Sequence, residues 1–171
     1  MNNNPSIELN EYFIRALDKI RSGKNLFITG RAGTGKSTLL HYFCSKSEKP
    51  VVILAPTGVA AVNVKGQTIR HFFGFGPDIT LRKIKKRISD EKRKLFEKLT
   101  VIVIDEISMV RADLLDCIDA FLRLHGPKKG KPFGGVQMVF IGDLYQLPPV
   151  VMSQERHAFS QLYKSPYFFS A

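Results

Sequence analysis

The fold of this chain is decided by Gly30-Arg31-Ala32-Gly33-Thr34-Gly35-Lys36-Ser37. The stretch matches a phosphate-binding pattern in which two spaced glycines precede Lys-Ser. The apolar run 26–29 before it predicts a buried strand, and residues 37–43 after it predict the start of a helix. In that context the loop N–H groups and the helix N-terminus converge on one point and attract an anion. We therefore expect a nucleotide-binding P-loop rather than a flexible glycine-rich turn.

The loop and the first residues of the following helix form the expected nucleotide site. Lys36 supplies a mobile cation for the outer phosphates, and Ser37 offers a hydroxyl to Mg²⁺. The residues expected to bind nucleotide are Gly30, Arg31, Ala32, Gly33, Thr34, Gly35, Lys36, Ser37 and Thr38.

The rest of the chain alternates short apolar runs with helical patterns. Three further strands are predicted at 51–55, 101–104 and 136–141, and helices at 7–20, 59–64, 81–99 and 114–124. The strands are continuous runs of Val, Ile, Leu and Phe, which is typical of a parallel sheet buried on both faces. The predicted fold class is α/β: a doubly wound parallel sheet covered by helices on both faces.

Polar residues follow the predicted strands where ligands gather in such a sheet, at the carboxyl ends. Asp105 and Glu106 end the strand at 101–104. Asp105 is placed to hold Mg²⁺ beside Ser37, and Glu106 to orient and deprotonate an attacking water. Gln146, past the last strand, is placed to hydrogen-bond the γ-phosphate or that water. The predicted catalytic set is Lys36, Asp105, Glu106 and Gln146; a helix N-cap or surface ion pair for the two acids, and a surface role for Gln146, remain the alternatives.

The composition of the chain indicates which class of partner it binds and in which kind of compartment it works. The formal net charge of +11 favours nucleic acid over a membrane as partner, although it also suits mere solubility. Cys44 and Cys117 are read as free thiols, which suggests a reducing compartment. The apolar runs are too short to cross a bilayer and the N-terminus has no signal core. We expect a soluble intracellular protein with no membrane partner, cytoplasmic if bacterial and nuclear or mitochondrial if eukaryotic.

Five segments together resemble motifs I, Ia, Ib, II and III of superfamily 1B DNA helicases of the PIF type, with RecD-type helicases more distant. These segments are 30–37, Leu54-Ala55-Pro56-Thr57-Gly58-Val59-Ala60-Ala61, Gly66-Gln67-Thr68-Ile69, Ile104-Asp105-Glu106-Ile107-Ser108-Met109 and Gly142-Asp143-Leu144-Tyr145-Gln146-Leu147-Pro148-Pro149-Val150. The resemblance covers nearly the whole chain in the right order. The last two segments are specific to this group, whereas a P-loop alone is not.

The resemblance implies an ATP- and Mg²⁺-dependent motor that moves 5′ to 3′ on single-stranded DNA. Implied partners are single-stranded DNA and duplex or structured DNA junctions, in repair, recombination and telomere maintenance. Residues 1–171 then form the N-terminal RecA-like domain (domain 1A) of a longer helicase. The second RecA-like domain, not found here, supplies an arginine finger and half of the DNA track in cis. We expect this chain to bind nucleotide, to hydrolyse it poorly and not to unwind DNA.

The resemblance also places a DNA track on this chain. Its residues would be Pro56, Thr57, Gly58, Val59, Thr68, Arg70, His71, Phe72 and Phe73. Arg70 and His71 stand where the family has His and Ser, and Phe13 stands where it often has a Gln that reads adenine. Core packing is an equal alternative for Phe72 or Phe73, since aromatic stripes are usually core.

Other basic and aromatic segments carry weaker expectations. Residues 82–98 hold nine Lys or Arg and three acids, and a solvated helix face is favoured over a DNA-binding patch. Lys128, Lys129 and Lys131 form a basic loop that contacts either DNA or water. The pattern fades after Pro149, and the aromatic run 167–169 suggests side chains that need a surface to pack on.

Two other functions fit the P-loop. A nucleotide kinase would need a lid with arginines and an acceptor pocket, and it would not explain a Gln146-Leu147-Pro148-Pro149 segment beside the site. A non-enzymatic module that binds DNA under nucleotide control would not explain Glu106.

Overall fold

A computed structural model describes residues 11–146 and 148–171, and its centre is a five-stranded parallel sheet. The strand order is β1-β5-β4-β2-β3. The strands are β1 (Leu26–Thr29), β2 (Val51–Ala55), β3 (Gln67–Thr68), β4 (Val101–Ile104) and β5 (Gln137–Gly142). The four predicted strands are confirmed, with β5 shifted by one residue. The short strand β3 was not predicted because its two polar residues carry no apolar run.

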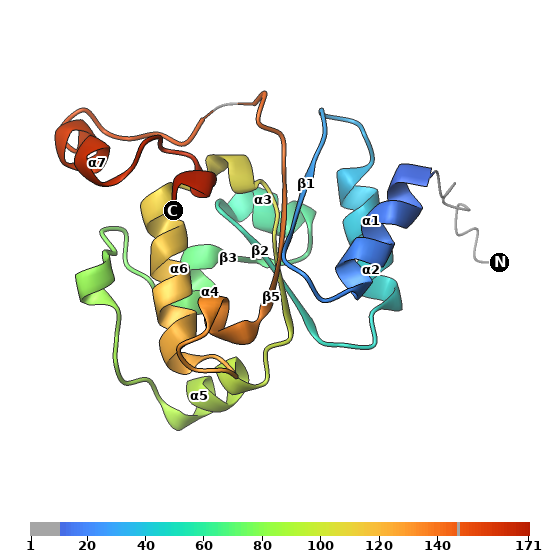
Figure 1. Ribbon diagram of the computed structural model, residues 1–171, viewed down its shortest axis with the longest axis horizontal. Helices are drawn as coiled ribbons and strands as arrows, with labels where there is room; N and C mark the ends of the chain where they lie inside the picture. Colours follow the sequence, from blue (N-terminus) through green and yellow to red (C-terminus); the bar gives the residue numbers. More distant parts are fainter. Residues whose placement is uncertain (1–10, 147) are drawn as a thin grey trace.

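Alternate residues of β1, β2, β4 and β5 supply two hydrophobic cores, one on either face of the sheet. In β4, Ile102 and Ile104 pack into one core, while Val101 and Val103 pack into the other. Helices α1 and α2 cover the second face, and α4, α5 and α6 cover the first (Figure 1). The predicted α/β sheet with helices on both faces is confirmed, and the double burial explains why β4 reads as an unbroken apolar run.

Seven α-helices lie within the described residues. They are α1 (Glu11–Arg21), α2 (Lys36–Lys46), α3 (Gly58–Asn63), α4 (Ile69–Phe73), α5 (Asp90–Glu97), α6 (Ala112–His125) and α7 (Arg156–Leu162). The predicted helix at 7–20 begins outside the described residues, and α1 continues it to Arg21. Both cysteines are free, Cys117 buried and Cys44 partly buried. No helix in the described part of the chain is long and apolar enough to span a membrane.

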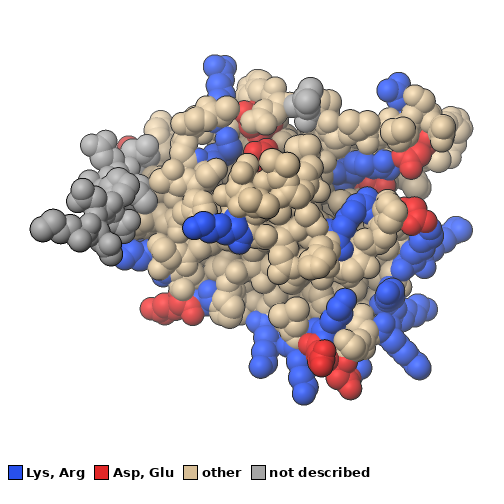
Figure 2. Space-filling model, turned by 180° about the vertical axis from the view of Figure 1, so that it is seen from behind, with Lys and Arg blue, Asp and Glu red and all other residues tan. Residues whose placement is uncertain are grey.

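The predicted helix at 81–99 is confirmed only in its second half, as α5 (Asp90–Glu97), and is wrong before residue 90. A 3₁₀ turn at Leu81–Lys83 is followed by an irregular segment, and α5 begins only after Ser89. The Ser89 hydroxyl accepts a hydrogen bond from the Lys92 N–H, which caps the helix. Ile84 and Ile88 pack against the core from the irregular segment, so their spacing imitated a helix. All nine Lys and Arg side chains of residues 82–98 are exposed. Figure 2 shows Lys and Arg gathered in the lower part of the molecule, the part in which Figure 1 places α5.

The end of the chain packs back onto its own domain. The Phe168 ring is buried and meets the rings of Phe27 and Phe140 at centroid distances of 5.1 and 5.7 Å. The surface that this aromatic run needs is therefore supplied for Phe168 by β1 and β5, whereas Phe169 remains exposed. Helix α7, just before it, was not predicted and has no buried residue.

Candidate nucleotide-binding site

The P-loop connects β1 to α2 and takes the backbone shape that its glycines allow. Gly33 and Gly35 have φ angles of 79° and 85°, in the left-handed region that favours glycine. Gly35 is also the N-cap of α2, so the helix begins directly at Lys36 with its first N–H groups free of a side-chain cap. These N–H groups and the positive end of the helix dipole face the loop, which makes this helix start suited to an anion.

The Lys36 ammonium is bound by the loop that precedes it. Its Nζ donates to the carbonyl oxygens of Gly30 and Arg31 at 2.7 and 3.0 Å. The Thr34 hydroxyl donates to the same Arg31 carbonyl at 2.8 Å. Since both acceptors of Lys36 are neutral, anionic phosphate oxygens would compete for the ammonium through stronger, charge-assisted bonds. The side chains of Ser37 and Thr38 stand exposed on the next turn.

Asp105 and Glu106 follow β4 at the carboxyl ends of the strands, as predicted. Asp105 is buried, and this burial raises the pKa of its carboxyl despite nearby Lys36 and His41. Burial also raises the pKa of Glu106, and the neighbouring charges of Asp105 and Asp143 raise it further. Glu106 has a φ of 51°, an uncommon left-handed conformation for a residue with a side chain. Strain and shifted pKa values gathered at one strand end are typical of a functional site.

Asp143, at the end of β5, organises the loop that carries Gln146. Its carboxylate accepts the Tyr145 N–H at 3.0 Å and the Gln146 Nε2 at 3.4 Å. These bonds, with the nearby charge of Lys36, hold the pKa of Asp143 below its usual range although the residue is buried. The sequence placed Asp143 at a strand end but assigned it no role. An acid directly after a buried strand, the signal that identified Asp105, also marks Asp143.

The turn after β4 and the end of β5 touch backbone to backbone. A Cβ atom at Gly142 would lie 2.9 Å from the Ile107 Cγ2 and 3.1 Å from the Ser108 nitrogen. Only glycine allows this approach, which brings the Asp105-Glu106 pair and the Asp143–Gln146 loop together beside Lys36. The predicted catalytic residues Lys36, Asp105, Glu106 and Gln146 therefore share one edge of the sheet, here called the carboxyl edge.

Oxygen donors for a divalent cation are present but few. No group of three His, Cys, Asp or Glu side chains within 11–146 and 148–171 is arranged to hold a metal. The predicted pair, the Ser37 hydroxyl and the Asp105 carboxylate, would supply two oxygens of the kind that Mg²⁺ prefers. Such a pair fits a cation whose other ligands come from phosphates and water, as is usual for Mg²⁺ at nucleotide sites.

The first predicted DNA segment lies at the same edge, after β2. The Thr57 hydroxyl accepts the Ala60 N–H at 3.3 Å and caps α3. Gly58 is exposed, Pro56 is partly buried, and the Val59 side chain is 76% exposed. An exposed helix start with a bare apolar side chain is suited to contact with a partner rather than to core packing.

The second predicted DNA segment, on α4, divides between surface and core. The Thr68 hydroxyl caps α4 by accepting the His71 N–H. The Arg70 guanidinium hydrogen-bonds the Gly76 carbonyl, and the His71 ring hydrogen-bonds the Gln67 side chain at 3.2 Å. Both side chains are thus held by neighbours within the segment.

The two phenylalanines of α4 differ in what they can reach. Phe73 is buried and its ring contacts the rings of Phe75, Phe96 and Phe121. The base-stacking surface that the sequence suggested for Phe73 is therefore covered by protein, and its ring is a core side chain. Phe72 is only partly buried and keeps some exposed surface.

Phe13, which the resemblance aligns with an adenine-reading glutamine, lies on α1. Its ring meets the Tyr42 ring edge-on at a centroid distance of 5.7 Å, between α1 and α2. It packs against the core on that face of the sheet. Phe13 is therefore a partly buried side chain that packs against the core.

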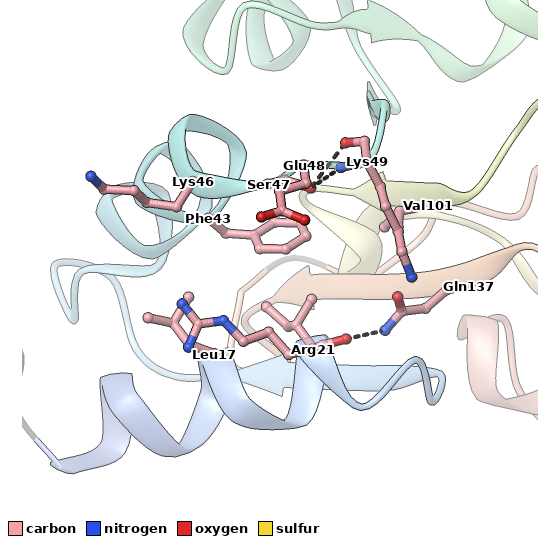
Figure 3. Close-up of a pocket in the computed structure, with 10 residues that line it drawn as sticks. Leu17, Arg21, Phe43, Lys46, Ser47, Glu48, Lys49, Val101 and Gln137 are labelled. Carbon is pink, nitrogen blue, oxygen red and sulfur yellow. Dashed lines mark hydrogen bonds between the residues drawn. The ribbon is translucent and has the colours of Figure 1, made fainter.

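A hollow of about 390 Å³ lies at the opposite edge of the sheet, here called the amino edge (Figure 3). It is lined by Arg21, Lys46 and Lys49 together with Glu48 and with the first residues of β4 and β5. Two of its uncharged polar side chains, those of Gln137 and Ser47, are bound to the backbone. The Gln137 amide donates to the Ile20 and Lys24 carbonyls at 2.7 and 2.9 Å, and the Ser47 hydroxyl donates to the Lys49 carbonyl. This hollow lacks the strand-end acids of the carboxyl edge.

Comparison with known proteins gives a consistent family. A profile described as PIF1-like helicase matches residues 8–168. The ATP-dependent DNA helicase PIF1 of Emericella nidulans is 40% identical over 152 residues, covering 81% of this chain and 20% of that protein. The ATP-dependent DNA helicase Pif1 of Bdellovibrio bacteriovorus is 39% identical over 158 residues, covering 88% of this chain and 35% of that protein.

Solved structures agree. The Pif1 helicase from Bacteroides in complex with ADP-AlF3 and ssDNA matches with a TM-score of 0.88 and 43% identity, covering 95% of this chain and 38% of that one. The Candida albicans Pif1 helicase matches with a TM-score of 0.75 and 35% identity, covering 96% of this chain and 37% of that one. The chain thus spans well under half of these relatives. It belongs to the PIF1-like helicase family and has the RecA-like fold of that family's ATPase domain.

Proposed function

We propose that this chain is the first ATPase domain of an ATP-dependent helicase that moves 5′ to 3′ on single-stranded DNA. One observation carries the proposal: the ends of β1, β4 and β5 bring Lys36, Glu106 and Gln146 to one edge of the sheet. Electrostatic coupling of Lys36 with Asp105, Glu106 and Asp143 supports a single site. The relatives named as ATP-dependent DNA helicases support the assignment.

In the proposed mechanism the P-loop binds the phosphates of ATP. Lys36 exchanges the Gly30 and Arg31 carbonyls for phosphate oxygens, and the N–H groups at the start of α2 bind the same anion. Ser37 and Asp105 would hold Mg²⁺, which supplies charge neutralisation on the phosphates when bound. The buried Asp105 is suited to this, because a cation favours the charged form that burial disfavours.

Glu106 is the proposed general base for the attacking water. Its raised pKa brings it closer to the pH at which it works, which makes the carboxylate a better proton acceptor. Gln146, held by Asp143 through a long hydrogen bond, is free to turn towards the γ-phosphate or the water. The site then hydrolyses ATP rather than passing its phosphate to a second substrate.

The proposed DNA track runs along the same edge. Its residues are Pro56, Thr57, Gly58, Val59, Thr68, Arg70, His71 and Phe72, with Phe73 anchoring α4 from the core. Free N–H groups and hydroxyls would hold phosphates, and Phe72 would offer ring surface to a base. A second RecA-like domain in cis would complete the track and supply an arginine finger, worth about 10³ to 10⁵ in rate in related phosphoryl-transfer enzymes. Duplex or junction DNA would be the substrate of the complete motor. The motor would work inside the cell.

The test is single-stranded DNA binding by this chain across a salt series, with and without a non-hydrolysable ATP analogue. We expect salt-sensitive binding whose affinity changes with the analogue. Charge reversal at Lys128, Lys129 and Lys131 flattens the salt dependence if that loop contacts phosphates. Nucleotide binding without any DNA binding at low salt would contradict a DNA track on this domain alone. Phosphate released to water, rather than to an acceptor, separates the proposal from a kinase.

A further inference from the structure

Ser108 carries a buried hydroxyl without a hydrogen-bond partner. The residue is fully buried, and its Oγ is the one buried side-chain nitrogen or oxygen left unpartnered among residues 11–146 and 148–171. A polar group in this state costs about 1–3 kcal/mol relative to one that is satisfied. Alanine would occupy nearly the same space without that cost, so packing alone does not account for the hydroxyl.

The position of Ser108 lies between the two halves of the carboxyl edge. It stands two residues after Glu106, in the 3₁₀ turn Ile107–Met109. Its backbone nitrogen approaches Gly142 so closely that a Cβ there would lie only 3.1 Å away. Asp143 comes next in the chain and holds Gln146 through a long bond of 3.4 Å. The Asp143–Gln146 loop therefore begins at the point where β5 meets the turn that carries Ser108.

We infer that Ser108 is a positioning residue, whose hydroxyl gains a hydrogen-bond partner on the Asp143–Gln146 loop when the γ-phosphate position is filled. The inference rests on the proposed ATPase function. When Gln146 turns towards the γ-phosphate, its bond to the Asp143 carboxylate is lost and an acceptor is released beside the turn that carries Ser108. The hydroxyl is unsatisfied in the nucleotide-free state and satisfied in the ATP-bound state, so it favours the arrangement that aligns Glu106 and Gln146.

The test compares the binding of two nucleotides to the wild-type chain and its variants, and it also measures the melting temperature of each nucleotide-free protein. Affinities for ADP and for a non-hydrolysable ATP analogue, both with Mg²⁺, are measured for the wild-type chain and for Ser108→Ala. The control is Ser160→Ala, which removes a hydroxyl on α7 that donates to the His157 carbonyl. Ser108→Cys, which keeps the side-chain shape but is somewhat larger and donates only weakly, is measured alongside.

We expect Ser108→Ala to weaken binding of the ATP analogue about fivefold, the value of one net hydrogen bond, and to leave ADP binding unchanged. The melting temperature of the nucleotide-free variant stays level or rises, because an unsatisfied group has been removed. Ser108→Cys shows the same selective loss and decides the question if alanine impairs folding. Equal effects on both ligands, or none, would overturn the role of Ser108. A wild-type chain that binds neither ligand would instead refute the proposed function.

Discussion

The two edges of the sheet carry similar kinds of side chain, but these side chains differ in how well the fold satisfies them. Each edge has a hollow or loop with lysines, an acid and an amide side chain. At the amino edge the Gln137 amide and the Ser47 hydroxyl are bound to backbone carbonyls (Figure 3). At the carboxyl edge the pKa of Glu106 is raised, its backbone is left-handed, and the Ser108 hydroxyl lacks a partner within the described residues.

The comparison teaches that a concave surface with charges is not sufficient evidence of a site. A neutral group that is bonded to the backbone, such as the Gln137 amide, stabilises the fold, and it gains no charge-assisted bond by exchanging its partners as the Lys36 ammonium would. Groups that are desolvated, strained or weakly bonded are stabilised when a ligand binds, because the fold has left their interactions incomplete. Matched substitutions at the two edges test this distinction.

The largest effect is expected from the two glutamates. Glu106→Gln removes the proposed base, so single-turnover ATP hydrolysis falls by about 10² to 10⁴. ATP binding persists, because the P-loop is untouched. Glu48→Gln in the amino-edge hollow is the control and leaves hydrolysis unchanged. Phosphate release measured for both variants decides the matter, and comparable losses in the two would erase the difference between the edges.

Two lysines give the next largest contrast. Lys36→Ala removes a charge-assisted contact to phosphate, which corresponds to about 10- to 100-fold weaker nucleotide binding. Lys49→Ala, at the amino edge, leaves the affinity as it was. Titration with a fluorescent ADP analogue measures both. Weaker binding in the Lys49 variant would point to a nucleotide contact at the wrong edge of the sheet.

The sheet and the P-loop were predictable because their signals are local. Continuous apolar runs identified four strands, since both faces of each are buried. Helix α7 gave no such signal because none of its residues is buried. It is held instead by polar contacts with distant residues: the Arg111 guanidinium binds Glu155 at 2.7 Å, and the Tyr163 hydroxyl donates to Asp116 at 2.7 Å. Contacts of this kind depend on tertiary placement and leave no periodicity.

The first half of the predicted helix at 81–99 failed for a related reason. Apolar side chains such as Ile84 and Ile88 reach the core from an irregular segment as readily as from a helix. The site shows the same division. Strand-end acids could be found by position, whereas the placement of the Ser108 turn beside the Asp143–Gln146 loop follows from the contact at Gly142. That contact joins two strands adjacent in space and distant in sequence.

A smaller effect, on stability alone, is expected at the amino edge. Gln137→Ala breaks the two hydrogen bonds from the side-chain amide to the Ile20 and Lys24 carbonyls. We expect a loss of about 1–3 kcal/mol in the free energy of unfolding, measured by denaturant, without a change in nucleotide affinity. Gln146→Ala, at the carboxyl edge, should do the reverse and slow hydrolysis with little effect on unfolding.

The smallest expected effect is the pH dependence of unfolding, and its sign differs between two glutamates. A folded-state pKa raised above the unfolded one, as for Glu106, makes the folded chain gain stability as pH falls from neutral through that pKa. Glu155, hydrogen-bonded to Arg111, has a lowered pKa, so its stabilisation is present above the unfolded pKa of about 4.5 and is lost as pH falls through the folded one. Glu106→Gln therefore raises the melting temperature at neutral pH and flattens its rise towards acid, whereas Glu155→Gln lowers it at neutral pH. The check is a set of melting curves recorded from pH 4 to pH 8. If both substitutions shifted the melting temperature in the same direction at neutral pH, the proposed destabilisation by the Glu106 carboxylate at the carboxyl edge would be contradicted.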